Sequence, residues 1–306
     1  MRVVVTGGRG FVGSRLVSAL HEAKHNVRSL DLADGLDICD RDAVRSALVD
    51  SDVVVHLAAW ADLYEARRNP IEAVRVNVLG TAVVADVVRS FGLRLVHGST
   101  ACVYGNQASY PSPESAVPNP TEIYAQTKLA AEQVIQGLVA SHNLDATIVR
   151  FPGVYGEGLR GSLAVARFFE RAVADGTLEI HGDGLQTRTP IHVDDLVAGL
   201  VRILEHADVR GIINLGTSEE ISALELARRI QAIVGRGRVE HVAQRLPQTY
   251  REVVDWRRAW EVLGWEPAIS LDEGLRRVWC WWCQRCDASG LRAPAEVGQQ
   301  SSLGGS

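Results

Sequence analysis

The first 150 residues alternate short apolar segments with longer amphipathic ones, and this alternation restricts the fold more than any other feature. Segments rich in β-branched and other apolar residues predict strands at 2–6, 26–31, 52–57, 93–98 and 146–151. Helical spacing of apolar residues predicts a helix from Gly10 onward and others at 40–49, 72–91 and 122–140. Near-continuous apolar strands belong in a parallel sheet covered on both faces. Right-handed crossovers then give a doubly wound α/β fold of the Rossmann type.

After residue 151 the pattern becomes less regular and richer in loops. Two capping boxes, Ser222 with Glu225 and Ser270 with Glu273, each mark the start of an amphipathic helix. We expect one domain over residues 1–150 and a smaller mixed α/β lobe over 151–286, interleaved because no linker separates them. Residues 287–306 are small, polar and glycine-rich, which predicts a disordered tail.

The charge and the apolar runs argue against several classes of protein. A net charge of −5 over 306 residues gives no electrostatic footprint for nucleic acid or an anionic membrane. No apolar run approaches the length of a bilayer span, and the N-terminus lacks the apolar stretch of a signal peptide. We therefore expect a cytoplasmic protein with neither of these partners.

Five cysteines are present, and an odd number does not indicate a disulfide framework in a cytoplasmic chain. Cys280, Cys283 and Cys286 recur every three residues, so their thiols could lie near one helix face and bind a metal. No fourth cysteine or histidine lies nearby. We therefore predict no metal site. We interpret the segment as a helix end packed by its three tryptophans, Trp279, Trp281 and Trp282.

A glycine-rich turn joins the first strand to the first helix. TGGRGFVG, residues 6–13, carries Gly7, Gly10 and Gly13, which let the backbone approach a ligand closely. Amides at the start of the helix, near Phe11 and Val12, would then hold a pyrophosphate. Asp31, at the end of the second strand, would accept both ribose hydroxyls of NAD and repel the 2′-phosphate of NADP. The sequence therefore predicts bound NAD.

Residues after the next strands complete the predicted dinucleotide site. Asp37 and Ile38 lie in a short loop that can meet the adenine. The third strand ends in Leu57-Ala58-Ala59, and its small side chains would let a cofactor lie across the strand ends. His56 precedes them among apolar residues, and we interpret it as a structural histidine rather than a catalytic base.

An ordered series of motifs resembles the extended short-chain dehydrogenase/reductases, and more narrowly the NAD-dependent nucleotide-sugar epimerase/dehydratase group. The motifs are TGGRGFVG (6–13), HLAA (56–59), NVLGT (77–81), GSTACVYG (98–105), YAQTK (124–128) and RFPGVYGEG (150–158). The resemblance continues to about residue 285. It implies NAD as the cofactor and a nucleotide-sugar substrate, with a UDP-sugar as the first expectation. It also implies a homodimer that pairs through the helices at 72–91 and 122–140.

Tyr124 and Lys128 stand one helical turn apart, and the resemblance makes them catalytic together with Thr100. A phenol with its ordinary pKa of about 10 is a poor base. Lys128 and a positively charged nicotinamide are expected to lower that pKa. Tyr124 would then take a proton from a sugar hydroxyl while the carbon gives its hydride to NAD. Thr100 would hydrogen-bond the same oxygen, and Lys128 would also hold the nicotinamide ribose.

The two residues after Thr100 limit the reaction. Family dehydratases usually have Asp and Glu there, whereas this chain has Ala101 and Cys102. Because alanine cannot transfer a proton, 4,6-dehydration and decarboxylation are disfavoured. What remains is 4-epimerisation, which needs only hydride shuttling. Cys102 has two interpretations. It either packs under the sugar as a small hydrophobe, or it resembles the catalytic cysteine of GDP-fucose synthase-type enzymes. Those enzymes also use a histidine, and this chain has no counterpart of it between residues 156 and 171.

Three alternatives stay open at this point. A reductase or dehydrogenase of a 4-keto sugar would use the same three residues but exchange NAD(H) in each turnover. A dehydratase variant would use Cys102. An NAD-sensing regulatory protein on the same fold is a non-enzymatic alternative, and the intact set of Thr100, Tyr124 and Lys128 argues against it.

Four residues are predicted to contact substrate beside Thr100. Arg188 matches the arginine that commonly grips the diphosphate, and Arg245 lies in a segment that loosely resembles a second phosphate-binding stretch. Gly153 stands where the family usually has an asparagine that contacts substrate. Trp60, directly after HLAA, either lines the sugar pocket or packs between the lobes. These departures leave the nucleotide and the sugar open.

Overall fold

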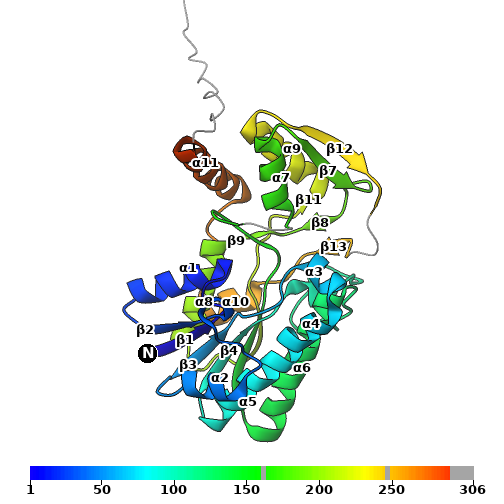
Figure 1. Ribbon diagram of the computed structural model, residues 1–306. Helices are drawn as coiled ribbons and strands as arrows, with labels where there is room; N and C mark the ends of the chain where they lie inside the picture. Colours follow the sequence, from blue (N-terminus) through cyan, green and yellow to red (C-terminus); the bar gives the residue numbers. More distant parts are fainter. Residues whose placement is uncertain (160–162, 245–248, 290–306) are drawn as a thin grey trace, which may run out of the picture.

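A six-stranded parallel sheet forms the centre of the computed structural model, which describes residues 1–159, 163–244 and 249–289, the last four as backbone only (Figure 1). Its strand order is β10-β5-β4-β3-β1-β2, so chain order reverses beside β1. The predicted doubly wound α/β fold is confirmed, and the five predicted strands agree with the structure to within one residue at each end. The six strands are β1 (Arg2–Thr6), β2 (Asn26–Leu30), β3 (Val53–His56), β4 (Arg94–Gly98), β5 (Asp145–Arg150) and β10 (Gly211–Asn214).

Helices cover both faces of this sheet because successive strand residues point to opposite sides. Val3 and Val5 of β1 pack with α1 (Phe11–Glu22) and α8 (Val193–Glu205) on one face. Val4, between them, packs on the other face, which three helices cover. Those helices are α2 (Arg41–Ala47), α5 (Thr81–Ser90) and α6 (Ile123–His142).

The helix predicted at 72–91 is not one regular α-helix. It consists of α4 (Pro70–Val74), a π-helical segment (Arg75–Gly80) and α5, and it follows the short helix α3 (Leu63–Arg68). Within the π segment Asn77 is fully buried and donates to the Trp60 carbonyl (3.2 Å) and the Thr127 hydroxyl (3.0 Å). A π turn of this kind often marks a functional site, and here it fixes the loop after β3 against α6.

The chain after β5 builds a second lobe above the carboxyl ends of the strands (Figure 1). Two helices, α7 (Ala164–Val173) and α9 (Ala223–Val234), pack on the parallel pair β7 (Thr177–His181) and β12 (Arg238–Val242). Short strands join this lobe to the sheet domain. They are β6 (Val154–Tyr155) with β9 (Ile191–His192), and β8 (Thr187–Arg188) between β11 (Ile221–Ser222) and β13 (Arg251–Glu252).

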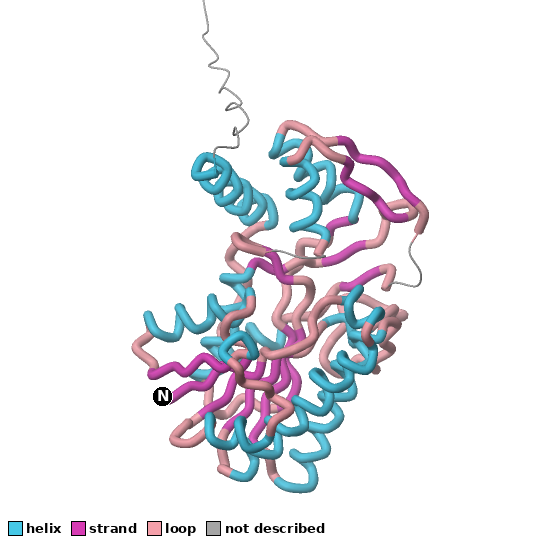
Figure 2. Tube along the Cα trace, viewed as in Figure 1, coloured by secondary structure: helices cyan, strands magenta, loops and turns pink. Residues whose placement is uncertain are grey.

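The chain crosses between the two parts more than once, as the sequence colours of Figure 1 show, and both parts contain helices and strands (Figure 2). α8, β10 and α10 (Arg257–Leu263) return to the sheet, whereas α9 lies in the second lobe. The two predicted helix starts are confirmed: Ser222 accepts from the Glu225 amide (3.1 Å), and Ser270 accepts from the Glu273 amide (3.3 Å). The glutamate half of each capping box is not formed, because Glu225 and Glu273 pair with Arg229 and Arg277.

The last helix, α11 (Leu271–Ser289), carries the tryptophan- and cysteine-rich segment. Trp279 and Trp282 pack against the core of the second lobe, as expected for a packed helix end. The helix continues through residues 287–289, the first three of the predicted tail, and 290–306 lie outside the described residues. Among the helices that the structure describes, none is long and apolar enough to cross a bilayer.

Candidate active site

A cavity of about 570 Å³ opens at the carboxyl ends of β1, β3 and β4, where chain order reverses in the sheet. Its walls include every residue predicted to bind the cofactor: Gly7, Gly10, Phe11, Val12, Asp31, Asp37, Ile38, Leu57, Ala58, Ala59, Tyr124 and Lys128. Thr100, Cys102, Trp60 and Gly153 also line it. The structure therefore brings the predicted cofactor and catalytic residues to one place.

The glycine turn has the close packing that a dinucleotide cradle needs. Gly7 has a φ of +70°, and a Cβ there would come within 2.7 Å of the Ala58 amide nitrogen. A Cβ on Gly13 would overlap the Gly7 carbonyl oxygen. No side chain caps the N-terminus of α1 at Gly10, so the first amides of the helix remain available to a pyrophosphate. These features fit NAD.

Asp31 is held at the end of β2 by two backbone amides. Its carboxylate accepts from the amides of Arg9 and Ala33, each at 3.0 Å. The Arg9 side chain, the nearest guanidinium on this loop, is engaged by Asp34 at 2.9 Å. An acid at the ribose position and an already paired arginine both favour NAD over NADP.

Asp37 and Ile38 have separate tasks in the adenine region. Asp37 accepts from the Cys39 amide and from Arg75, each at 2.9 Å. These contacts, the Cys39 amide first, hold the pKa of Asp37 below its usual value. Ile38 is buried and forms part of the apolar wall. The carboxylate therefore orders the loop, and its neighbour adds apolar surface to the cavity wall.

His56 is a structural residue, as interpreted from the sequence. It is fully buried, with its Nδ1 2.7 Å from the Thr6 hydroxyl and its Nε2 3.0 Å from the Thr81 hydroxyl. Burial, with the charge of Lys128, lowers its pKa to about 3. A neutral ring bonded on both sides cannot act as a base at the strand end.

Lys128 projects from α6 toward the end of β4. Its ammonium donates to the Gly98 carbonyl at 2.6 Å and lies 3.4 Å from His97 Nε2. Burial lowers the pKa of Lys128 to about 8, and Glu132 acts in the opposite direction. Glu132 is itself held by Arg150 at 3.0 Å, and both side chains are buried. A buried ion pair between Glu132 and Arg150 thus lies near Lys128 in the interior.

The pKa of Tyr124 is shifted upward, contrary to the expectation that Lys128 would lower it. Burial is the main cause, Cys102 and Glu252 add to it, and a hydrogen bond with Thr100 opposes it. The expectation was wrong for a geometric reason: the Lys128 ammonium turns to the Gly98 carbonyl instead of the phenol. The positive charge that would favour a phenolate must therefore come chiefly from a bound nicotinamide.

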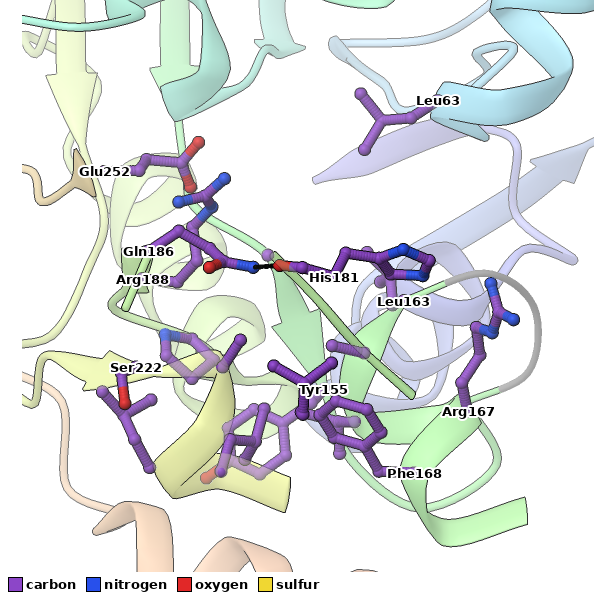
Figure 3. A pocket seen from close by; sticks show the side chains of 18 of the residues that line it. Leu63, Tyr155, Leu163, Arg167, Phe168, His181, Gln186, Arg188, Ser222 and Glu252 are labelled. Carbon is purple, nitrogen blue, oxygen red and sulfur yellow. Dashed lines mark hydrogen bonds between the residues drawn. The ribbon is translucent and has the colours of Figure 1, made fainter. Parts of the chain in front are cut away.

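A second cavity of about 280 Å³ adjoins the first and enters the second lobe (Figure 3). Cys102 and Gly153 line both cavities, so the two cavities meet at these residues. Arg188 lines the second one, and its Nη1 and Nη2 donate to the carbonyls of Thr187 and Thr249 at 2.7 Å each. Arg245 lies outside the described residues.

Trp60 lies in the wall of the larger cavity, which favours pocket lining over packing between the lobes. Its amide donates to Asn77 Oδ1 at 2.7 Å, so the buried π segment sets the position of this tryptophan. The position of Trp60 in the cavity wall thus favours the first of the two alternatives, lining the pocket, over packing between the lobes.

Two carboxyl groups beside the smaller cavity were not predicted from the sequence. Glu252 of β13 is only 5% exposed and lines this cavity together with Cys102. Burial and this carboxylate raise the pKa of Cys102 well above its usual value. Glu122, at the start of α6, lines the same cavity. No motif identifies Glu252, because its position depends on how β13 pairs with β8 far along the chain.

One cluster outside these cavities contains ligand-type side chains. Glu157, His192 and Asp194 have candidate ligand atoms within 4.8 Å of one another. Arg15 lies 3.5 Å from both carboxylates, and Arg277 lies 3.7 Å from Asp194. These charges make the cluster an ion-pair junction between α1, α8 and α11 rather than a site of excess negative charge.

The comparisons with known proteins agree with this geometry. A UDP-glucuronic acid decarboxylase from Arabidopsis thaliana is 30% identical over 90% of this chain and 87% of its own length. The UDP-glucose 4-epimerase of Thermotoga maritima, solved with UDP-glucose, superposes with a TM-score of 0.87 at 27% identity, covering 93% of this chain and 99% of that one. A dTDP-glucose 4,6-dehydratase from Streptomyces venezuelae, solved with NAD, has a TM-score of 0.88 at 25% identity, covering 95% and 100%.

The family model of the NAD dependent epimerase/dehydratase family matches residues 3–216. That range contains the glycine turn, Asp31, Thr100, Tyr124 and Lys128, which line one cavity here. The cofactor of the family is NAD, and the cradle described above fits it. This chain belongs to the NAD dependent epimerase/dehydratase family.

Proposed function

We propose that the protein is a nucleotide-sugar 4-epimerase that works with tightly held NAD. One observation carries the proposal: Thr100, Tyr124 and Lys128 line the dinucleotide cavity, while the positions directly after Thr100 offer no carboxylate. Oxidation at C4, rotation of the ketone and return of the hydride to its other face need only these groups. The similarity to a UDP-glucose 4-epimerase supports a UDP-sugar as substrate.

Each of the three side chains has a separate task. Bound NAD accepts and returns the hydride. Tyr124 takes the proton of the C4 hydroxyl and gives it back after the ketone has turned. Thr100, which lines the same cavity as the phenol, steadies the oxygen as its charge changes. Lys128, fixed by Gly98, is placed to hold the nicotinamide ribose.

Residues 101 and 102 argue against a dehydratase or a decarboxylase that relies on the family's Asp and Glu at those positions. Ala101 carries no acid. It is fully buried in an apolar cluster with Val103, Tyr104 and Val254, and its amide donates to the Phe151 carbonyl at 2.8 Å. The nearby relatives include decarboxylases and dehydratases, but this chain cannot supply their chemistry from residue 101. A ketoreductase with exchangeable NAD(H) is the second candidate, because it would use the same three residues.

A homodimer in the cytoplasm is part of the same proposal. Three apolar side chains on the helical segment 70–80 are solvent-exposed, namely Ile71, Val74 and Leu79, and Val139 on α6 is exposed as well. These segments correspond to the helices expected to pair. A second copy would remove this apolar surface from water.

The test is incubation of the purified protein with UDP-glucose, UDP-N-acetylglucosamine, UDP-glucuronate and the matching dTDP and GDP sugars, without added cofactor. We expect a new anomeric proton signal at unchanged mass with one of them, and none with Tyr124→Phe. Loss of water or of carbon dioxide would contradict the 4-epimerase. Conversion of a keto-sugar only when NADH is added would support the ketoreductase instead.

A further inference from the structure

The smaller cavity contains a buried carboxylate that the epimerase reaction does not use. Glu252 ends β13, and parallel pairing with β8 sets it directly opposite Arg188. Figure 3 shows the two side chains facing each other at one side of the cavity. Glu252 and Cys102 line the same cavity, burial and the charge of Glu252 raise the pKa of the Cys102 thiol, and Cys102 is two residues from Thr100. Glu252 therefore stands beside the place where the sugar reacts.

Glu122 is a second carboxyl group at this end of the cavity, and burial raises its pKa. The charges of Arg188 and Arg67 oppose that rise, and the charge of Glu252 adds to it. Arg188 lies opposite Glu252 on the neighbouring strand, and its Nη1 and Nη2 already bind backbone carbonyls. The arginine opposite Glu252 therefore has donors that are largely engaged by the protein itself.

Another arginine lies at the opposite side of the cavity. Arg167 of α7 projects from the far wall in Figure 3, well apart from Glu252, and its nearest ion-pair partner is Glu179 at 4.0 Å. A phosphate bound toward Arg167 would leave the sugar at the Cys102 end. Arg188, expected from the sequence to grip the diphosphate, would then instead face the sugar beside Glu252. The two ends of the cavity therefore suit different parts of one ligand.

We propose that Glu252 restricts the substrate to nucleotide sugars whose sugar is uncharged, and that it rejects sugars with a carboxylate at C6. The inference rests on the proposed nucleotide-sugar function. The C6 hydroxyl of a neutral sugar has a proton to donate to the Glu252 oxygens, whereas the C6 carboxylate of a uronate has none and brings a second negative charge beside a buried acid. Like charges at close range in such a site discriminate strongly between two otherwise similar ligands.

The experiment measures binding to the NAD-loaded Tyr124→Phe protein, so that turnover does not alter the ligands. Calorimetry compares UDP-glucose with UDP-glucuronate, which differ only at C6. We expect UDP-glucose to bind at least about tenfold more tightly. Adding Glu252→Gln, which keeps the side-chain shape, should reduce this ratio to about threefold or less, mainly through tighter binding of UDP-glucuronate.

Two further variants give the comparison its controls. Glu122→Gln should reduce the ratio less than Glu252→Gln, because Glu122 is only partly buried. Glu240→Gln removes one exposed charge from β12 of the same lobe and should leave the ratio unchanged. Far-UV circular dichroism and thermal melts confirm that each variant is folded.

Two results would overturn the role of Glu252: equal or tighter binding of UDP-glucuronate by the parent protein, or a ratio that Glu252→Gln leaves unchanged. Failure of the epimerase proposal has a different signature. In that case the binding ratio stands, but the wild-type protein produces no new anomeric signal from any neutral sugar nucleotide. Turnover of UDP-glucuronate with a ratio near one would contradict the charge selection and leave epimerisation intact.

Discussion

Lys128 is buried, and burial disfavours the charged ammonium that its proposed role requires. Its pKa is about 8 in the folded chain, against 10.5 when exposed, so the folded state binds this proton more weakly. The resulting destabilisation is fully present below pH 8 and disappears as the pH rises toward 10.5. Lys128→Met should therefore stabilise the protein at pH 7 by about 1–2 kcal/mol, after the lost bond to Gly98 is counted, while abolishing turnover.

Urea unfolding at pH 7 and at pH 10 checks this expectation. The advantage of Lys128→Met over wild type should be smaller at pH 10. Lys24→Met is the matched control, because Lys24 is the other lysine of the chain and is exposed. A Lys128→Met protein that is less stable than wild type at pH 7 would show that the Gly98 contact outweighs the cost of burying the charge.

The family resemblance singled out Thr100, Tyr124 and Lys128, and the glycine turn followed by an acid at the next strand end singled out Asp31; the structure brings all four to one cavity. The direction in which Lys128 reaches was not predictable. It depends on the Gly98 carbonyl of β4, a tertiary partner that helical spacing does not specify. Glu252 was missed for a related reason: its place beside Cys102 follows from the register between β13 and β8.

At the scale of elements, the turn between β1 and α1 is the most tightly packed joint of the site. Gly13→Ala would normally favour a helix, but here the added methyl overlaps the Gly7 carbonyl oxygen. The helix must then move away from the turn. We expect NAD affinity to fall by at least about tenfold and stability to fall by about 1–3 kcal/mol.

Gly137→Ala on α6 separates this effect from helix propensity. A Cβ at Gly137 meets no atom within 4 Å, so this variant should gain roughly 0.5–1 kcal/mol and leave NAD binding unchanged. Fluorescence titration with NADH and chemical unfolding measure the two quantities. Unchanged NAD affinity in Gly13→Ala would mean that the close approach is not needed for the cofactor.

Strands were predicted to within one residue because burial on both faces leaves an almost continuous apolar signal. The helix at 72–91 was predicted only in outline. Its apolar spacing is compatible with a regular α-helix, and the π segment arises from the inward bonds of Asn77 to Trp60 and Thr127. A side chain that bonds across the fold changes the local winding without changing the hydrophobic pattern.

For the whole molecule, the proposed dimer rests on apolar surface that a single chain leaves exposed. Every predicted residue of the cofactor cavity comes from one chain, so the dimer need not complete that part of the site. Leu79 is 51% exposed on the helical segment proposed to pair. Leu79→Glu should therefore convert the dimer into monomers, with an increase of about tenfold or more in the dissociation constant of the dimer.

Light scattering after gel filtration measures the mass of each form. Val117→Glu places the same charge on another exposed apolar residue, 78% exposed and outside the paired helices, and should remain dimeric. NADH affinity of the Leu79→Glu monomer should stay within about threefold of wild type, because buried Asn77, rather than Leu79, positions the cavity wall at Trp60. A wild-type protein that is monomeric at micromolar concentration would contradict pairing through these helices.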